Sequence, residues 1–118
     1  MKKILLIYLL FIVVSCNFLK DGIEIEISNN SKVPLKNLKF STSENKEVLT
    51  FKELKSGEKI NEFLSMKDNK TDGSFSLEFT NQKGEIKKLT AGYYSNGKPL
   101  DNKIIFMIQK DTTLIKIN

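Results

Sequence analysis

An alternation of apolar and polar residues with a period of two dominates the chain from Ile23 onward. Residues 23–27 place three Ile on one face and two Glu on the other, and residues 75–80 repeat this pattern with Phe and Leu. Such alternation is typical of β-strands that bury one face and expose the other. Shorter versions of the pattern occur at residues 38–40, 48–51 and 114–117.

Residues 104–108 are apolar throughout, which predicts a strand that is covered on both faces. Helical periodicity is poor except near residues 60–66, where one helical turn fits the pattern. Polar turn signals separate the apolar segments, at residues 28–31, 55–58, 68–73, 81–84, 95–97 and 110–111. Short strands between such signals predict an all-β fold, an antiparallel sandwich or barrel of about seven to eight strands.

Two stretches resemble features of small immunoglobulin-like domains of bacterial exported proteins. Residues 25–31 and 38–40 resemble a first strand, a polar turn and a second strand, and residues 51–58 resemble a strand that runs into a Gly-Glu turn. The resemblance implies an immunoglobulin-like β-sandwich and no particular activity. Within such a sandwich we expect Phe75, Leu77 and Phe79 to meet Ile25 and Phe106 in one apolar layer.

The first residues of the chain have a different composition. Lys2 and Lys3 precede an uninterrupted apolar run over residues 4–14. A membrane-spanning helix needs about 20 apolar residues, so this run is too short to be one. Its length and its positive flank are typical of a signal peptide, and we expect that peptide to be helical and to cover residues 1–15.

The run ends in Val13-Val14-Ser15-Cys16, which resembles the lipobox of bacterial lipoprotein signal peptides. The resemblance implies that Cys16 receives a diacylglycerol on its sulfur and, after cleavage, becomes an acylated N-terminus. Asn17 follows it instead of the Asp linked to inner-membrane retention, which favours the outer membrane if the host has one. The alternatives are a conventional secretory signal with an incidental Cys, or an uncleaved anchor.

Cys16 is the only cysteine of the 118 residues, so the mature chain cannot form an internal disulfide. We expect residues 16–22 to be a lipidated N-terminus and a linker, and residues 23–118 to be the β-sandwich domain. Residues 17–22 span at most about 20 Å, which keeps the domain near the membrane.

The composition excludes several kinds of chemistry. The chain has no His, so it lacks an imidazole base, a His-ligated metal and a Ser-His-Asp triad. Its Lys residues are scattered along the chain and interleaved with acidic residues, which disfavours a nucleic-acid partner. Two Ser-x-x-Lys matches, at Ser56 and Ser95, lie in Gly-containing turns and not on a helix. A calcium-loop match at residues 68–73 has Lys70 where an oxygen ligand belongs. We therefore predict no catalytic, cofactor-binding or metal site.

The most distinctive polar stretch runs from Gly92 to Pro99. Asn96-Gly97 favours a type I′ hairpin turn. On the preceding strand Tyr93 and Tyr94 must point to opposite faces, so one packs inward with its hydroxyl bonded to the backbone and the other is exposed. We expect the outward Tyr and Lys98 to contact a partner, whereas the alternative is an ordinary hairpin that binds nothing.

These observations predict a lipid-anchored protein of the bacterial cell envelope. Its expected role is that of a non-catalytic binding or scaffolding module. The membrane is contacted through the lipid on Cys16, and the expected partner is an envelope protein or a glycan. The alternative is a small-ligand-binding protein or an envelope enzyme that uses carboxylates.

Overall fold

A computed structural model describes residues 21–118, which contain strands and turns but no helix. The expected signal-peptide helix and the lipidation site Cys16 lie outside the described residues. No helix that could cross a membrane occurs in the described part of the chain. Nine strands lie within it, namely β1 (Gly22–Asn29), β2 (Leu35–Thr42), β3 (Val48–Leu54), β4 (Lys59–Ser65), β5 (Gly73–Thr80), β6 (Ile86–Ser95), β7 (Lys98–Pro99), β8 (Lys103–Ile108) and β9 (Thr113–Ile117).

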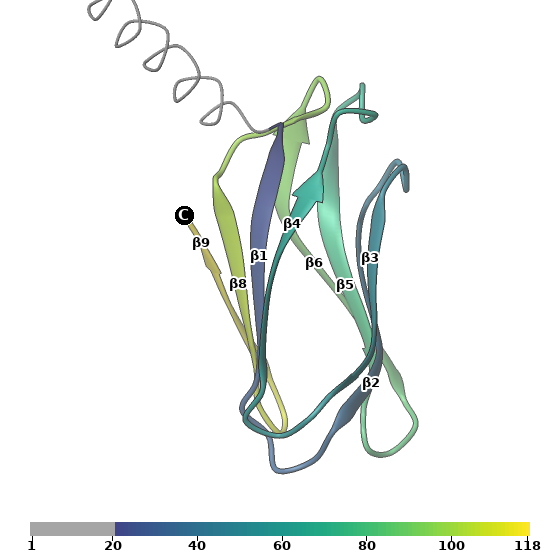
Figure 1. The fold of residues 1–118 in the computed structure, drawn as a ribbon, viewed down its shortest axis with the longest axis vertical. Coiled ribbons are helices and arrows are strands. Elements are labelled where there is room, and N and C mark those ends of the chain that lie inside the picture. The colour runs from purple at the N-terminus through teal and green to yellow at the C-terminus, as the bar shows by residue number, and fades with distance from the viewer. Residues whose placement is uncertain (1–20) are drawn as a thin grey trace, which may run out of the picture.

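The strands form two facing sheets (Figure 1). One sheet has the order β4-β1-β8-β9 and the other has the order β3-β2-β5-β6-β7. The all-β prediction is confirmed, but nine strands replace the expected seven to eight, and β1 and β8 pair in parallel, with Ile27 opposite Phe106. The parallel pair is a correction to the antiparallel expectation. Its physical reason is that β1 and β8 lie far apart in the sequence, so no hairpin sets their relative direction.

The core lies between the two sheets and follows the alternation of the strands. Phe40 of β2 stacks on Phe75 of β5, with ring centroids 6.0 Å apart, and meets Phe106 of β8 edge-on at 5.9 Å. Phe106 belongs to the other sheet, so these rings join the two layers. The expected apolar layer is confirmed, because one buried cluster contains Ile25, Phe75, Leu77, Phe79 and Phe106.

Two segments differ from their predicted form. Residues 60–66, where one helical turn fitted the pattern, lie in the strand β4 (Lys59–Ser65) except for Met66, and this strand pairs with β1. Ile60 and Leu64 are four residues apart, a spacing that shares a face in a helix and in a strand alike, so the pattern was ambiguous. In β8, Ile105 and Met107 are only half-buried, because no other described element covers the outer face of that sheet.

The two stretches that resemble immunoglobulin-like domains contact each other at one end of the sandwich. The buried Asn29 side chain donates to the carbonyl of Leu54 at 2.9 Å, and the N–H of Gly57 donates to the carbonyl of Asn29 at 2.8 Å. The Ser56 hydroxyl donates to the carbonyl of Ser31. These bonds fasten the β1–β2 turn to the β3–β4 turn, and thereby one sheet to the other.

The opposite end, which we call the N-terminal end, contains the start of β1 and the C-terminus (Figure 1). There the N–H of Met66 donates to the carbonyl of Asp21 at 2.9 Å, and the N–H of Asn102 donates to the carbonyl of Asn118 at 2.7 Å. The β2–β3, β4–β5 and β6–β7 connections lie at the same end. This end therefore brings together the first described residue and the predicted Tyr hairpin.

Candidate functional site: the β6–β7 hairpin

The turn of the β6–β7 hairpin has the predicted geometry. Asn96 has φ 51° and Gly97 has φ 76°, so both central residues take the positive angles of a type I′ turn. The turn is also fixed by its neighbours. The N–H of Gly97 donates to the carbonyl of Thr71 at 2.8 Å, and the N–H of Asn96 donates to Asp72 Oδ1 at 2.8 Å. A Cβ at position 97 would overlap the backbone carbonyl of Asn69, so only glycine fits.

A β-bulge sets which Tyr points outward. Tyr93 pairs with Ser74, whereas Ala91 pairs with Phe75, so Gly92 is an extra residue in β6. Gly92 takes φ 71°, which glycine adopts without steric cost. The outcome is one exposed and one buried tyrosine, as predicted: Tyr93 is 71% exposed and Tyr94 is 2% exposed. The sequence pattern did not reveal the bulge.

The buried Tyr94 hydroxyl has a different partner from the expected one. It donates to Glu44 Oε2 at 2.9 Å and lies 3.2 Å from Ser43 Oγ, so it is bonded to side chains and not to the backbone. The reason is that the β2–β3 loop closes over the end of β6 and brings Glu44 within reach. The Tyr94 ring packs on Phe75, with centroids 5.4 Å apart.

Glu44 joins the β2–β3 loop, the β4–β5 loop and the end of β6 at the N-terminal end. Its carboxylate accepts hydrogen bonds from the N–H of Lys70 at 3.1 Å and of Thr71 at 3.2 Å, as well as from Tyr94. Desolvation acts to raise the pKa of the Glu44 carboxyl. The hydrogen bonds from Lys70, Tyr94 and Thr71 outweigh it and hold that pKa below its ordinary value, because they favour the charged form.

The outward face of the hairpin carries three exposed side chains. Ser95 pairs with Lys98 and Tyr94 with Pro99, so the same register places Leu100 opposite Tyr93. The N–H of Leu100 accordingly donates to the carbonyl of Tyr93 at 3.4 Å. Because Lys98 and Leu100 are two residues apart, they share the face of Tyr93. We call Tyr93, Lys98 and Leu100 the hairpin surface.

The sequence pattern predicted Tyr93 and Lys98 as contact residues but not Leu100, which is 67% exposed. The sequence nevertheless contained a signal for Leu100. A two-residue turn at Asn96-Gly97 fixes the order of the residue pairs in the hairpin, and the third pair counted from the turn is Tyr93 with Leu100. Cys16, the fourth predicted site residue, lies outside the described part of the chain.

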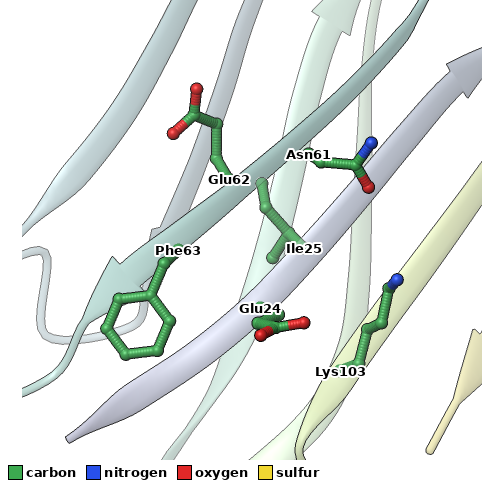
Figure 2. A pocket seen from close by; sticks show the side chains of 6 residues that line it. All are labelled: Glu24, Ile25, Asn61, Glu62, Phe63 and Lys103. Atoms are coloured by element: carbon green, nitrogen blue, oxygen red, sulfur yellow. The ribbon is translucent and has the colours of Figure 1, made fainter. Parts of the chain in front are cut away.

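A second feature is an open groove of about 310 Å³ beside β1, β4 and β8. Figure 2 shows the six side chains that line it, those of Glu24, Ile25, Asn61, Glu62, Phe63 and Lys103. Glu24 pairs with Phe63 on the outer face, whereas Glu62 pairs with the buried Ile25. The two carboxylates therefore lie on opposite faces of the sheet, and they point away from each other in Figure 2.

Charge near this groove is paired across the strands. Lys103 Nζ lies 3.6 Å from Glu26 Oε1, and Lys59 Nζ lies 3.8 Å from the same oxygen. Residues 21–118 contain no group of three or more His, Cys, Asp or Glu side chains that could hold a metal ion. The groove therefore offers the outer carboxylate of Glu24 together with an amide, an ammonium group and an aromatic ring, from Asn61, Lys103 and Phe63.

The two facing sheets and the fixed hairpin define a β-sandwich domain. No protein-family model matches the chain, and no curated protein matches it. Its fold is similar to that of a protein from Eubacterium rectale whose structure was determined by NMR. That similarity has a TM-score of 0.53 at 17% sequence identity, and it covers 83% of this chain and 89% of the other. At such an identity the similarity concerns the fold alone.

Proposed function

We propose that this protein is a lipid-anchored protein of the bacterial cell envelope whose β-sandwich acts as a non-catalytic binding or scaffolding module. The observation that carries the proposal is the order of the N-terminal features: two Lys, an apolar run, Ser15 and then the only Cys of the chain. Two or more acyl chains on Cys16 would hold the protein firmly, since each buried CH₂ contributes about 0.8 kcal/mol.

An immunoglobulin-like sandwich is part of this proposal. Two facing sheets of short, mostly antiparallel strands support it. The partner is an envelope protein or a glycan, and the outer membrane is the location if the host has one. The hairpin carries Tyr93 and Lys98 exposed on a turn that is fixed to Thr71 and Asp72, and this supports a binding role, because its backbone needs no ordering on contact.

The alternative function is the binding or turnover of a small ligand in the groove beside β1 and β4. The presence of Glu24, Asn61 and Phe63 around one hollow favours it. The arrangement of the groove's carboxylates favours the non-catalytic role, because paired-carboxylate hydrolysis needs two carboxyl groups that converge on one bond. Glu24 and Glu62 lie on opposite faces of their sheet.

The anchor is tested by metabolic labelling with a palmitate analogue. The natural chain should carry the label and remain with the membranes. Cys16→Ser should carry none and should accumulate as an uncleaved precursor or a released product. Label that persists in the Ser variant would exclude Cys16 as the acylation site, and an unlabelled natural chain would exclude the lipoprotein assignment altogether.

A further inference from the structure

The hairpin surface lies at the end of the domain to which the anchor is joined. Asp21, the first described residue, accepts a hydrogen bond from the N–H of Met66 at this end. Asn102, two residues after Leu100, accepts one from the N–H of Glu24 near the start of β1. The span from Cys16 to Asp21 is at most about 18 Å in the fully extended chain. An acylated Cys16 therefore holds the N-terminal end next to the bilayer.

The composition of the hairpin surface suits the boundary between lipid and water. Tyr93 and Leu100 lie opposite each other across the hairpin, joined by the hydrogen bond from the N–H of Leu100 to the carbonyl of Tyr93, and they are 71% and 67% exposed. Such an apolar pair on a surface is unfavourable in water and favourable against acyl chains. Tyrosine in particular is enriched where an apolar environment meets the headgroups, because its ring is apolar and its hydroxyl is polar. Lys98 beside them can meet a phosphate group.

The charged residues at the N-terminal end show whether electrostatic attraction or apolar burial would drive a contact with the membrane. The connections at this end and β7 contain four Lys and five acidic residues, namely Lys46, Lys67, Lys70 and Lys98 with Glu44, Glu47, Asp68, Asp72 and Asp101. They give no net attraction to anionic headgroups, so the apolar pair must supply the contact energy. The hairpin needs no ordering on contact, since the turn is already fixed to Thr71 and Asp72.

We propose that the hairpin surface rests on the bilayer that the acyl chains enter, with Tyr93 and Leu100 at the boundary between the headgroups and the acyl chains. The proposal rests on the lipid anchor proposed above and names the occupant of this surface as lipid. In this orientation the far end of the sandwich, which carries Asn29 and the β5–β6 turn, points away from the membrane. That end and the outer sheet faces remain for an envelope protein or a glycan.

The absence of Trp from the chain makes a clean experiment available. Leu100→Trp places one indole on the hairpin surface. Ile86→Trp is the matched control, because Ile86 is 68% exposed on the same strand β6 but at its other end. Each variant is prepared as the full acylated protein in vesicles of phosphatidylethanolamine and phosphatidylglycerol whose acyl chains carry bromine, which quenches nearby indoles.

We expect loss of most of the Leu100→Trp emission in brominated vesicles relative to unbrominated ones, at low and at high salt, and no loss for Ile86→Trp. Thermal melting checks the fold of both variants, and Tyr93→Trp replaces Leu100→Trp if the latter is unfolded. A chain that floats with the vesicles but is unquenched at both positions would overturn this orientation and leave the lipid anchor intact. A chain that does not float would overturn both proposals.

A protein or glycan partner on the hairpin surface is the other outcome. In that case Leu100→Trp would stay unquenched, and Tyr93→Ser would lose a partner that crosslinks to the natural chain in intact envelopes. This result would also overturn the membrane-facing orientation, because the same side chains cannot be buried in lipid and in a partner at once.

Discussion

The hydroxyl of Tyr94 donates a hydrogen bond of 2.9 Å to the carboxylate of Glu44, fifty residues earlier in the chain. This contact joins the end of β6 to the β2–β3 loop, and Glu44 in turn holds the backbone of Lys70 and Thr71. The strand end that carries the exposed Tyr93 is therefore held by residues of two loops, β2–β3 and β4–β5.

Removal of the hydroxyl tests that support. Tyr94→Phe should lower the melting temperature modestly, because the ring still fills its place against Phe75 and only the hydrogen bonds are lost. Hydrogen exchange at the N–H groups of Lys70 and Thr71 should become faster, since Glu44 is then held less firmly. Unchanged exchange at these two sites would show that the loop does not depend on Tyr94.

The same carboxylate makes stability depend on pH. The folded-state pKa of Glu44 lies below its ordinary value of 4.5, so its contribution is complete above that pH and disappears as the pH falls through the folded-state pKa. Natural protein and Glu44→Gln should therefore differ in melting temperature at pH 7, and the difference should shrink below about pH 4.5. A difference that stays constant down to pH 3 would contradict this linkage.

The central ring of the core should dominate stability. Phe106→Ala removes a fully buried ring that contacts Phe40 and should cost about 3–5 kcal/mol in denaturant melts. Glu26→Ala, on the outer face of the adjacent strand, removes two ion pairs with surface lysines and should cost at most about 1 kcal/mol. Equal losses at the two positions would show that the faces of the sheet had been misassigned.

The hairpin turn can be tested with two glycines that share one backbone angle. Gly84 and Gly97 both have φ 76°, but a Cβ at Gly84 would meet nothing within 4 Å, whereas one at Gly97 would overlap the Asn69 carbonyl. Gly84→Ala should cost about 1–2 kcal/mol from the left-handed backbone alone. Gly97→Ala should cost clearly more, measured in the same melts. Equal costs would mean that the turn is not docked on the β4–β5 loop.

The sequence alone determined which residues face the core and where the Tyr hairpin turns. A period of two assigns Ile25, Phe75 and Phe79 to inner faces whatever their partners are, and Asn96-Gly97 fixes a tight turn through its own backbone preferences. These are local properties, so each can be recognised within a few residues.

Only the tertiary structure decided which segments that are distant in the sequence contact each other in space. The parallel pairing of β1 with β8, the bulge at Gly92 and the bond from Tyr94 to Glu44 all depend on the path of the whole chain. No periodicity encodes them, because each strand is compatible with several neighbours until the core selects one arrangement. The exposed pair of Tyr93 and Leu100 depends on both. The local turn at Asn96-Gly97 sets which residues are opposite each other, and the tertiary structure leaves the two side chains uncovered.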